Sequence, residues 1–224
     1  MRDSYERFFS QDYITKKQFF EFGLSETIFS PIDKAEPAWL ELKANIANNN
    51  KVYIRGFGRN STGTHLFQEF YRHVLGNEQV TVDPTNNNQP TKLIRDLTGF
   101  SKTKSSRHKP IQNYQVSHVF GRTKNVFAFT APWNIAYIPK ILDPFTGHEA
   151  KGDMIDEYQA LFKQQGYKHF EPLIEDYNKL ITSPDLKARI SEYLDQIMSN
   201  GTIEPKDVEK LSKSVNEELS PIII

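Results

Sequence analysis

The chain carries two histidines and one asparagine whose order and surroundings could support hydrolysis: His118, Asn134 and His148. A histidine with a reference pKa of ~6.5 is mostly neutral at cellular pH, so it can accept a proton from water. Imidazole also binds divalent metals, alone or together with oxygen ligands. His118 therefore qualifies as a general base, and His148 qualifies as a metal ligand.

The local pattern predicts the elements that would hold these side chains. Residues 113–120 alternate, with Val116, His118 and Phe120 on one face, which is typical of a half-buried strand. We expect residues 121–125 to form a hairpin connection. Residues 126–137 should supply the return strand that carries Asn134, and a helix should start near Gly147 and end at Gly166.

Other segments give a coarse map of the rest of the chain. Pro31 and Pro37 are expected in a loop, and Gly99 should stop a helical turn. The predicted helices are residues 1–30, 39–46, 64–75, 92–97, 170–181, 184–199 and 205–218, the predicted strands are 51–57 and 80–82, and the predicted loops are 83–90 and 101–109.

Together these elements predict an α+β protein. We expect a mixed N-terminal region over residues 1–110, a strand–strand–helix core over 111–165, and a helical C-terminal part over 166–224. The N-terminal region is the expected DNA-recognition part, and the C-terminal helices are a possible dimerisation element.

Composition and charge restrict the possible functions. The 224 residues contain no Cys, which excludes disulfides, a thiol nucleophile and Cys-ligated zinc. No apolar run approaches the ~20 residues needed to cross a bilayer, so we expect a soluble cytoplasmic protein. The formal net charge is zero, but residues 92–151 hold ten Lys or Arg against three Asp or Glu. This local charge of +7 favours phosphate binding.

The order His118, Asn134, His148, placed on strand, strand and helix, resembles the ββα-metal (HNH) nuclease family. The resemblance covers about 40 of the 224 residues. It implies that His118 is the general base and that His148 ligates a metal, most simply Mg²⁺ or Mn²⁺. Asn134 would hold the loop behind the base or ligate the metal. Ser117 stands where many members have an Asp or His ligand, so Glu149 is a possible additional ligand.

Basic and amide side chains near these positions could contact DNA. Arg122, Lys124 and Lys151 are the candidates for phosphate contacts. Arg55, Arg59 and Asn60 lie in an N-terminal loop and could read base edges in the major groove, although they are also ordinary turn residues.

These features suggest a site-specific enzyme that resembles a type II restriction endonuclease. It would hydrolyse double-stranded DNA, and a two-fold symmetric target would require a homodimer. A cognate DNA methyltransferase would then act separately. A homing or nicking nuclease with the same motif fits the sequence nearly as well.

Two other classes of function are possible. His118 alternates with apolar residues and could be a satisfied core histidine. The non-enzyme alternative is a nucleic-acid-binding module with a non-catalytic motif, and Ser117, a poor ligand, is the residue that favours it. Residues 58–64 also have the glycine spacing of a phosphate loop, with Asp83 as a faint second nucleotide motif. That loop lacks the lysine of a phosphate loop, so nucleotide hydrolysis is not favoured, and a strand, a glycine turn and a capped helix explain the whole pattern.

Overall fold

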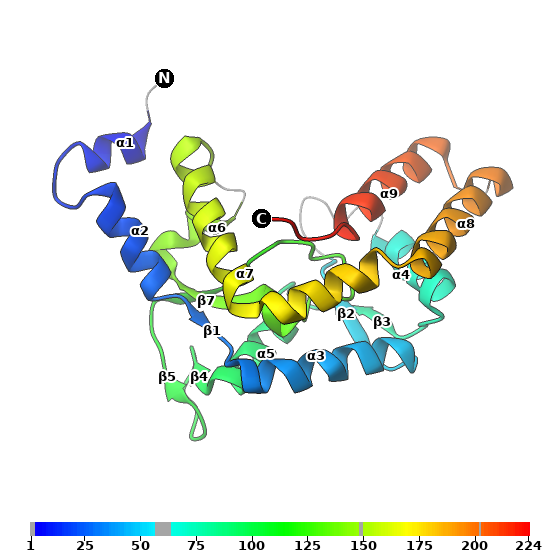
Figure 1. Cartoon of the computed structure of the whole chain (residues 1–224), viewed down its shortest axis with the longest axis horizontal. Coiled ribbons are helices and arrows are strands. Elements are labelled where there is room, and N and C mark those ends of the chain that lie inside the picture. The colour runs from blue at the N-terminus through cyan, green and yellow to red at the C-terminus, as the bar shows by residue number, and fades with distance from the viewer. Residues whose placement is uncertain (1–2, 57–63, 148–149, 202) are drawn as a thin grey trace.

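The computed structural model describes every residue except 1–2, 57–63, 148–149 and 202 (Figure 1). Its helices and strands are α1 Ser4–Phe9, α2 Lys16–Ser25, β1 Ile28–Phe29, α3 Ile32–Ala47, β2 Val52–Ile54, α4 Thr64–Leu75, β3 Val80–Val82, α5 Asn88–Thr98, β4 Phe100–Ser101, β5 Lys109–Pro110, β6 Tyr114–His118, η1 Pro132–Asn134, β7 Ile135–Pro139, η2 Lys140–Leu142, α6 Asp143–Thr146, α7 Asp153–Ile181, α8 Pro184–Asn200 and α9 Pro205–Glu218. The predicted α+β class is confirmed. Within the described part of the chain, no helix is long and apolar enough to cross a membrane.

The strands form three small sheets. β1, β7 and β6 make an antiparallel sheet in that order, so β6 is an edge strand. β2 and β3 pair in parallel across the connection that contains α4. β4 and β5 form a short parallel pair below the first sheet in the view of Figure 1.

Helices cover both faces of the antiparallel sheet. Ala136 packs with Phe162 of α7 on one face, and Val116 packs with Ile94 of α5 on the other. Figure 1 shows α7 above the sheet and α5 below it. Successive side chains of a strand point to opposite faces. Each side chain of β6 therefore points either to the face that α7 covers or to the face that α5 covers.

The largest hydrophobic core draws on all three predicted segments. Trp133 lies at its centre, with its ring 5.7 Å from that of Trp39 and 4.9 Å from that of Tyr177. The same core extends from Ala35 in α3 to Ile222 near the C-terminus. The N-terminal region, the strand–strand–helix part and the C-terminal helices therefore pack as parts of one core.

Several predicted elements have the bounds expected from the sequence. α4 spans Thr64–Leu75, α9 spans Pro205–Glu218 and β3 spans Val80–Val82, as predicted. Gly99 ends α5 in the left-handed conformation, with φ of 75°. Such elements combine a periodic apolar pattern with local start and stop signals.

The predicted return strand is wrong over its first half. Residues 126–130 form turns, and β7 begins only at Ile135. Asn134 lies in η1, one residue before the strand. The run from Val126 to Phe129 is apolar because it enters the core as a loop, and short apolar runs do not distinguish a buried loop from a strand.

The predicted end of the long helix at Gly166 is also wrong. α7 begins at Asp153 instead of near Gly147, and it continues to Ile181. A kink at Phe170, whose φ is −118°, precedes Pro172, which has no N–H for the helix ladder. Gly166 is buried inside the helix, where an added Cβ would lie 2.8 Å from Val119 Cγ1.

Two predicted loops are partly helical. Pro37 lies inside α3, in its second turn, where its missing N–H removes one hydrogen bond to Asp33. α5 begins at Asn88, within the predicted loop 83–90. The buried Asp83 carboxylate accepts hydrogen bonds from the N–H groups of Asn88 and Gln89 and so stabilises this helix start.

We predict that Gly166→Ala lowers the free energy of unfolding by roughly 1–3 kcal/mol, because the new methyl group would collide with the stiff side chain of Val119. Helix propensity alone predicts the opposite sign, a gain of about 1 kcal/mol. Urea denaturation of both single variants and of Gly166→Ala/Val119→Ala tests this. In the Val119→Ala background the Gly166 substitution should cost less, and a more stable Gly166→Ala single variant would contradict the packing argument.

Candidate functional site

The candidate site lies where β6 ends and β7 begins. The two strands are antiparallel, and His118 is the register partner of Ile135. The pairing extends by one more bond, because Val119 N–H donates to the Asn134 carbonyl at 2.8 Å. His118 and Asn134 therefore meet at one end of the strand pair, joined by the loop of residues 119–134, here called the 119–134 loop.

Asn134 holds the 119–134 loop together with its side-chain amide. Its Nδ2 donates to the carbonyls of Gly121 and Ala128, each at 2.9 Å. Its Oδ1 accepts the Phe120 N–H at 2.8 Å. The side chain is fully buried, so the amide serves backbone groups that water cannot reach. Of the two roles predicted for Asn134, this geometry favours holding the loop over binding a metal.

Asn125 is a second polar anchor of the same loop. Its Oδ1 accepts the Phe127 N–H at 2.8 Å. Its Nδ2 donates to the Tyr177 hydroxyl at 2.9 Å and to the Glu218 carbonyl at 2.8 Å. The 119–134 loop is thus tied to α7 and to the end of α9.

The His118 ring is held by one residue of this loop, Phe129. The two rings stack with centroids 5.4 Å apart, and His118 Nε2 lies 2.9 Å from the Phe129 carbonyl oxygen. A carbonyl only accepts, so Nε2 carries the proton and Nδ1 of the neutral ring is left as the basic nitrogen.

The surroundings of His118 favour its neutral form. Burial lowers its pKa from 6.5 to about 4; the Phe129 carbonyl and Asp83 oppose this shift, and the positive charge of Arg55 adds to it. Arg55 belongs to the segment after β2, and its N–H donates to the Thr123 carbonyl at 2.9 Å. The N-terminal region therefore reaches the site through Arg55.

Ser117 and His118 face opposite sides of the sheet. Ser117 Oγ lies 3.3 Å from Thr146 Oγ1 at the end of α6, on the side that α7 covers. His118 points to the other side, as strand alternation requires. His148 and Glu149, the predicted ligands, lie outside the described residues. The structure therefore places the end of α6 next to Ser117, and His118 on the opposite face.

Two of the predicted phosphate contacts are engaged within the protein. The Arg122 guanidinium donates to the carbonyls of Glu217 and Pro221, at 2.6 Å and 2.8 Å, and to the Ser220 hydroxyl. Lys124 places its ammonium 5.5 Å from the centre of the Phe67 ring. The Arg122 bonds fasten the 119–134 loop to the C-terminal segment, and Lys124 packs its end against α4.

The remaining predicted DNA contacts are only partly placed. Lys151 and Arg55 are exposed, so both are free to meet a ligand at the surface. Arg59 and Asn60 fall outside the described residues, as does most of the glycine-rich segment 58–64.

The described residues do not by themselves make a metal centre. Among them, no three His, Asp or Glu side chains are grouped so that they could hold a metal ion. The Asn134 oxygen is buried and bonded to Phe120 N–H, and the Ser117 hydroxyl is engaged with Thr146. This part of the chain therefore does not fit a divalent cation.

Comparisons with known proteins place the chain in a family. A family model described as "Uncharacterised protein PM1201" matches residues 30–224. The chain belongs to this family. A relative from Pasteurella multocida (strain Pm70), "Uncharacterized protein PM1201", is 45% identical over 196 residues, which is 86% of each chain. No solved structure matches the chain. Neither description states an activity, so function has to be argued from the chemistry of the site.

Sequence reasoning missed the distant partners of the site in this family member. Phe129 orients His118, and Tyr177 and Glu218 anchor Asn125. Tyr177 and Glu218 lie in helices far along the chain, where local pattern reveals only helical periodicity. The residues around Phe129 are compatible with a strand. Its place in a loop, where its carbonyl accepts a hydrogen bond from His118, was therefore not predicted.

We predict that Asn134→Asp lowers the free energy of unfolding by about 3 kcal/mol or more. A carboxylate in place of Nδ2 would face two carbonyl oxygens and leave both without a donor in a buried site. Chemical denaturation measures the loss. The same substitution at the exposed Asn216 is the control and should change stability by a few tenths of a kcal/mol. Equal effects at both positions would contradict the anchoring role.

We also predict that His118 makes the protein less stable in acid. Its pKa is about 4 when folded and ~6.5 when unfolded, so between these values the unfolded chain binds the extra proton. Stability therefore falls as the pH drops through this window. Between pH 7.5 and 5.0 the expected loss from His118 is about 2 kcal/mol.

His118→Gln tests this, because glutamine can still donate to the Phe129 carbonyl but does not titrate. The unfolding free energy of the variant should fall by about 2 kcal/mol less than that of the wild type over the same pH interval. Parallel pH curves for the two proteins would show that the histidine is not kept neutral by its surroundings.

Proposed function

We propose that the protein is a metal-dependent DNA endonuclease that uses His118 as its general base. The observation that carries this proposal is the state of His118 at the end of β6. Its Nε2–H is fixed to the Phe129 carbonyl, and Asn134 holds the loop that supplies this carbonyl. The strand, anchored loop, strand and helix follow the order of the HNH family that the sequence resembles.

The chemistry required of His118 is proton transfer from water. Nδ1 would take a proton as the water oxygen attacks phosphorus, and the bond from phosphorus to the leaving 3′ oxygen would break. The low pKa keeps the ring neutral, and so able to accept this proton, throughout the physiological pH range. A positioned general base of this kind contributes roughly 10²–10⁴-fold to a rate.

Metal dependence rests on the resemblance. A divalent cation, Mg²⁺ or Mn²⁺, would neutralise charge on the scissile phosphate and the leaving oxygen. His148 and Glu149 are the proposed ligands, and the described residues alone do not fit the ion. No step of the mechanism is therefore assigned to it here.

The finer proposal is restriction of double-stranded DNA by a homodimer. Arg55 supports a DNA contact next to the base, because it is exposed, has no ion pair among the described residues and stands close enough to His118 to influence its charge. A homing or nicking role would use the same chemistry.

A second candidate is a nucleic-acid-binding module with a non-catalytic motif. The observation in its favour is Ser117, which stands where the HNH family often has a metal ligand and is bonded to Thr146. Such a protein would hold DNA without a divalent cation and would never cut it.

Cleavage of unmethylated plasmid DNA, with Mg²⁺, Mn²⁺ or EDTA, tests the nuclease. We expect metal-dependent cutting that His118→Ala reduces at least 10²-fold while circular dichroism and DNA binding are retained. Discrete fragments would support the restriction role, and a smear would mean a nonspecific nuclease.

His169→Ala is the matched control. The His169 ring also stacks on a phenylalanine, Phe29, and its Nε2 lies 3.1 Å from the Ser30 carbonyl, but it sits in α7. Its loss should leave cutting unchanged. Normal cutting by His118→Ala would refute the base assignment, and binding without any cutting by the wild type would favour the binding module.

A further inference from the structure

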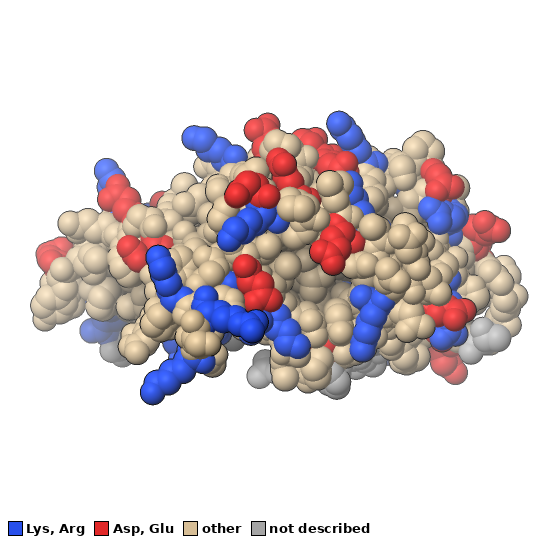
Figure 2. All heavy atoms as spheres, turned by 90° about the horizontal axis from the view of Figure 1, so that it is seen from below, with Lys and Arg blue, Asp and Glu red and all other residues tan. Residues whose placement is uncertain are grey.

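The segment around β4 and β5 projects from the molecule with an excess of positive charge. Figure 2 shows Lys and Arg side chains gathered over the region where β4 and β5 lie in Figure 1. We call this surface the β4–β5 patch. Its residues are Lys102, Lys104, Arg107, Lys109 and Lys140, all exposed.

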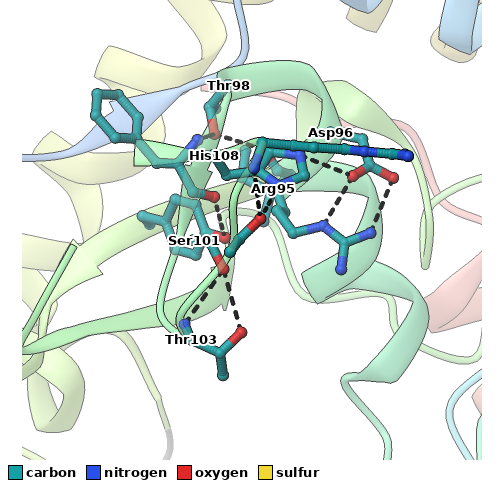
Figure 3. Close-up of polar contacts among 11 residues, drawn as sticks. Arg95, Asp96, Thr98, Ser101, Thr103 and His108 are labelled. Carbon is teal, nitrogen blue, oxygen red and sulfur yellow. Dashed lines mark hydrogen bonds and ion pairs between the residues drawn. The ribbon is translucent and has the colours of Figure 1, made fainter. Parts of the chain in front are cut away.

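Internal hydrogen bonds give the β4–β5 segment a defined shape (Figure 3). Ser101 Oγ accepts the Thr103 N–H at 3.2 Å. Ser105 Oγ lies 2.9 Å from His108 Nδ1, and His108 Nε2 lies 3.4 Å from Asp96 Oδ1. The cations are thus carried by a braced loop.

Asp96, an acid at the base of the loop, does not neutralise the β4–β5 patch. Asp96 is occupied by its neighbour Arg95, whose Nε and Nη2 lie 2.8 Å and 3.2 Å from its two carboxylate oxygens. Its remaining contact goes to His108, inside the braced loop. The Asp96 carboxylate is therefore engaged by Arg95 of α5 and by His108 at the base of the loop.

Two cations of the patch come from distant parts of the chain. Lys140 belongs to η2 after β7, and its N–H donates to the Asn113 carbonyl at 2.7 Å. Its side chain lies close enough to Lys102 for the two charges to repel each other. The pKa of Lys102 is lowered, first by burial and then by the positive charge of Lys140, while Asp143 opposes the shift. An anion bound between the two lysines would relieve their repulsion.

The patch and His118 belong to the same side of the antiparallel sheet. Phe100 of β4 accepts a hydrogen bond from the Tyr137 hydroxyl at 3.2 Å and packs in the cluster that contains Val116. Val116 and His118 share a face of β6. Lys140 lies opposite Asn113, just before β6, and His118 ends β6, so about 17 Å of strand separates the two positions.

We propose that the β4–β5 patch binds the phosphate backbone of double-stranded DNA while the duplex runs along the sheet edge formed by β6 toward His118. The separation of about 17 Å equals roughly five base pairs at 3.4 Å each, so one duplex can touch both positions. The choice of DNA rests on the proposed function. The β4–β5 patch differs from the predicted phosphate contacts Arg122, whose guanidinium the C-terminal segment engages, and Lys124, whose ammonium lies over the Phe67 ring.

Binding of a fluorescent 20-base-pair duplex in EDTA, at several salt concentrations, tests the proposal. The test variant is Lys102→Gln/Lys104→Gln/Arg107→Gln/Lys140→Gln in the full chain. The slope of log K against log salt is negative, and each lost phosphate contact reduces its magnitude by about 0.9. We therefore expect the magnitude of the slope to be smaller by roughly 3 to 4 in this variant. Melting temperature and circular dichroism confirm that the variant is folded.

The control removes the same charge elsewhere. Lys168→Gln/Lys187→Gln/Lys206→Gln/Lys213→Gln changes four exposed lysines of α7, α8 and α9, and its salt slope should stay within about one of the wild type. Equal slopes for the patch and control variants would overturn the inference. Binding of a heparin fragment as tight as that of the duplex would overturn the choice of DNA.

The two proposals fail separately. If the wild type binds duplex through the β4–β5 patch but never cuts it, the nuclease function fails and the patch stands. If the wild type cuts DNA while the patch variant keeps the wild-type salt slope, the patch fails and the nuclease function stands.

Discussion

The site depends above all on the buried amide of Asn134. The loop between β6 and β7 enters the core, where its backbone N–H and C=O groups lose water and need partners inside the protein. Asn134 supplies three hydrogen bonds at once, to Phe120 N–H, Gly121 C=O and Ala128 C=O. Because those groups lie on both arms of the loop, one side chain fixes its closure, and with it the Phe129 carbonyl that orients His118.

This constraint explains why the C-terminal helices belong to the site's scaffold. Arg122 and the buried Asn125 of the closed loop both donate to backbone carbonyls near the end of α9. The Lys124 N–H completes the contact by donating to the Glu218 carboxylate at 3.0 Å. The sequence suggested that Arg122 binds phosphate, but its guanidinium is engaged by these internal acceptors. Closure of the loop therefore also fixes Arg122 against the C-terminal segment.

Local sequence signals predicted elements whose cause is local. α4 and α9 have apolar faces at helical spacing with clear start and stop residues, and their bounds could be read directly. Elements set by tertiary contacts were missed. From the sequence alone, Gly166 predicts a helix end. In the structure it lies inside α7, where the absence of a side chain leaves room for Val119. Residues 126–131 resemble a strand because the core requires apolar side chains whatever the backbone does.

The candidate site could also be predicted only where local sequence signals determine it. The end of β6 at His118 follows from alternation, and a loop-holding role for Asn134 follows from the family resemblance. Its partners Phe129, Tyr177 and Glu218 do not follow, because their contacts depend on how distant segments pack. The proximity of Lys102 and Lys140 is of the same kind, since these residues belong to segments that are far apart in the sequence.

The burial of His118 creates a tension that DNA binding can resolve. A pKa of about 4 keeps the ring neutral but makes it a weak base at neutral pH. Arg55 contributes to this depression, and a phosphate that pairs with Arg55 would cancel that contribution. The phosphate's own negative charge would raise the pKa of His118 further toward the working pH. In the proposed nuclease, bound DNA would therefore make His118 a stronger base for the water that attacks phosphorus, and His118 in the free protein would stay a poor base.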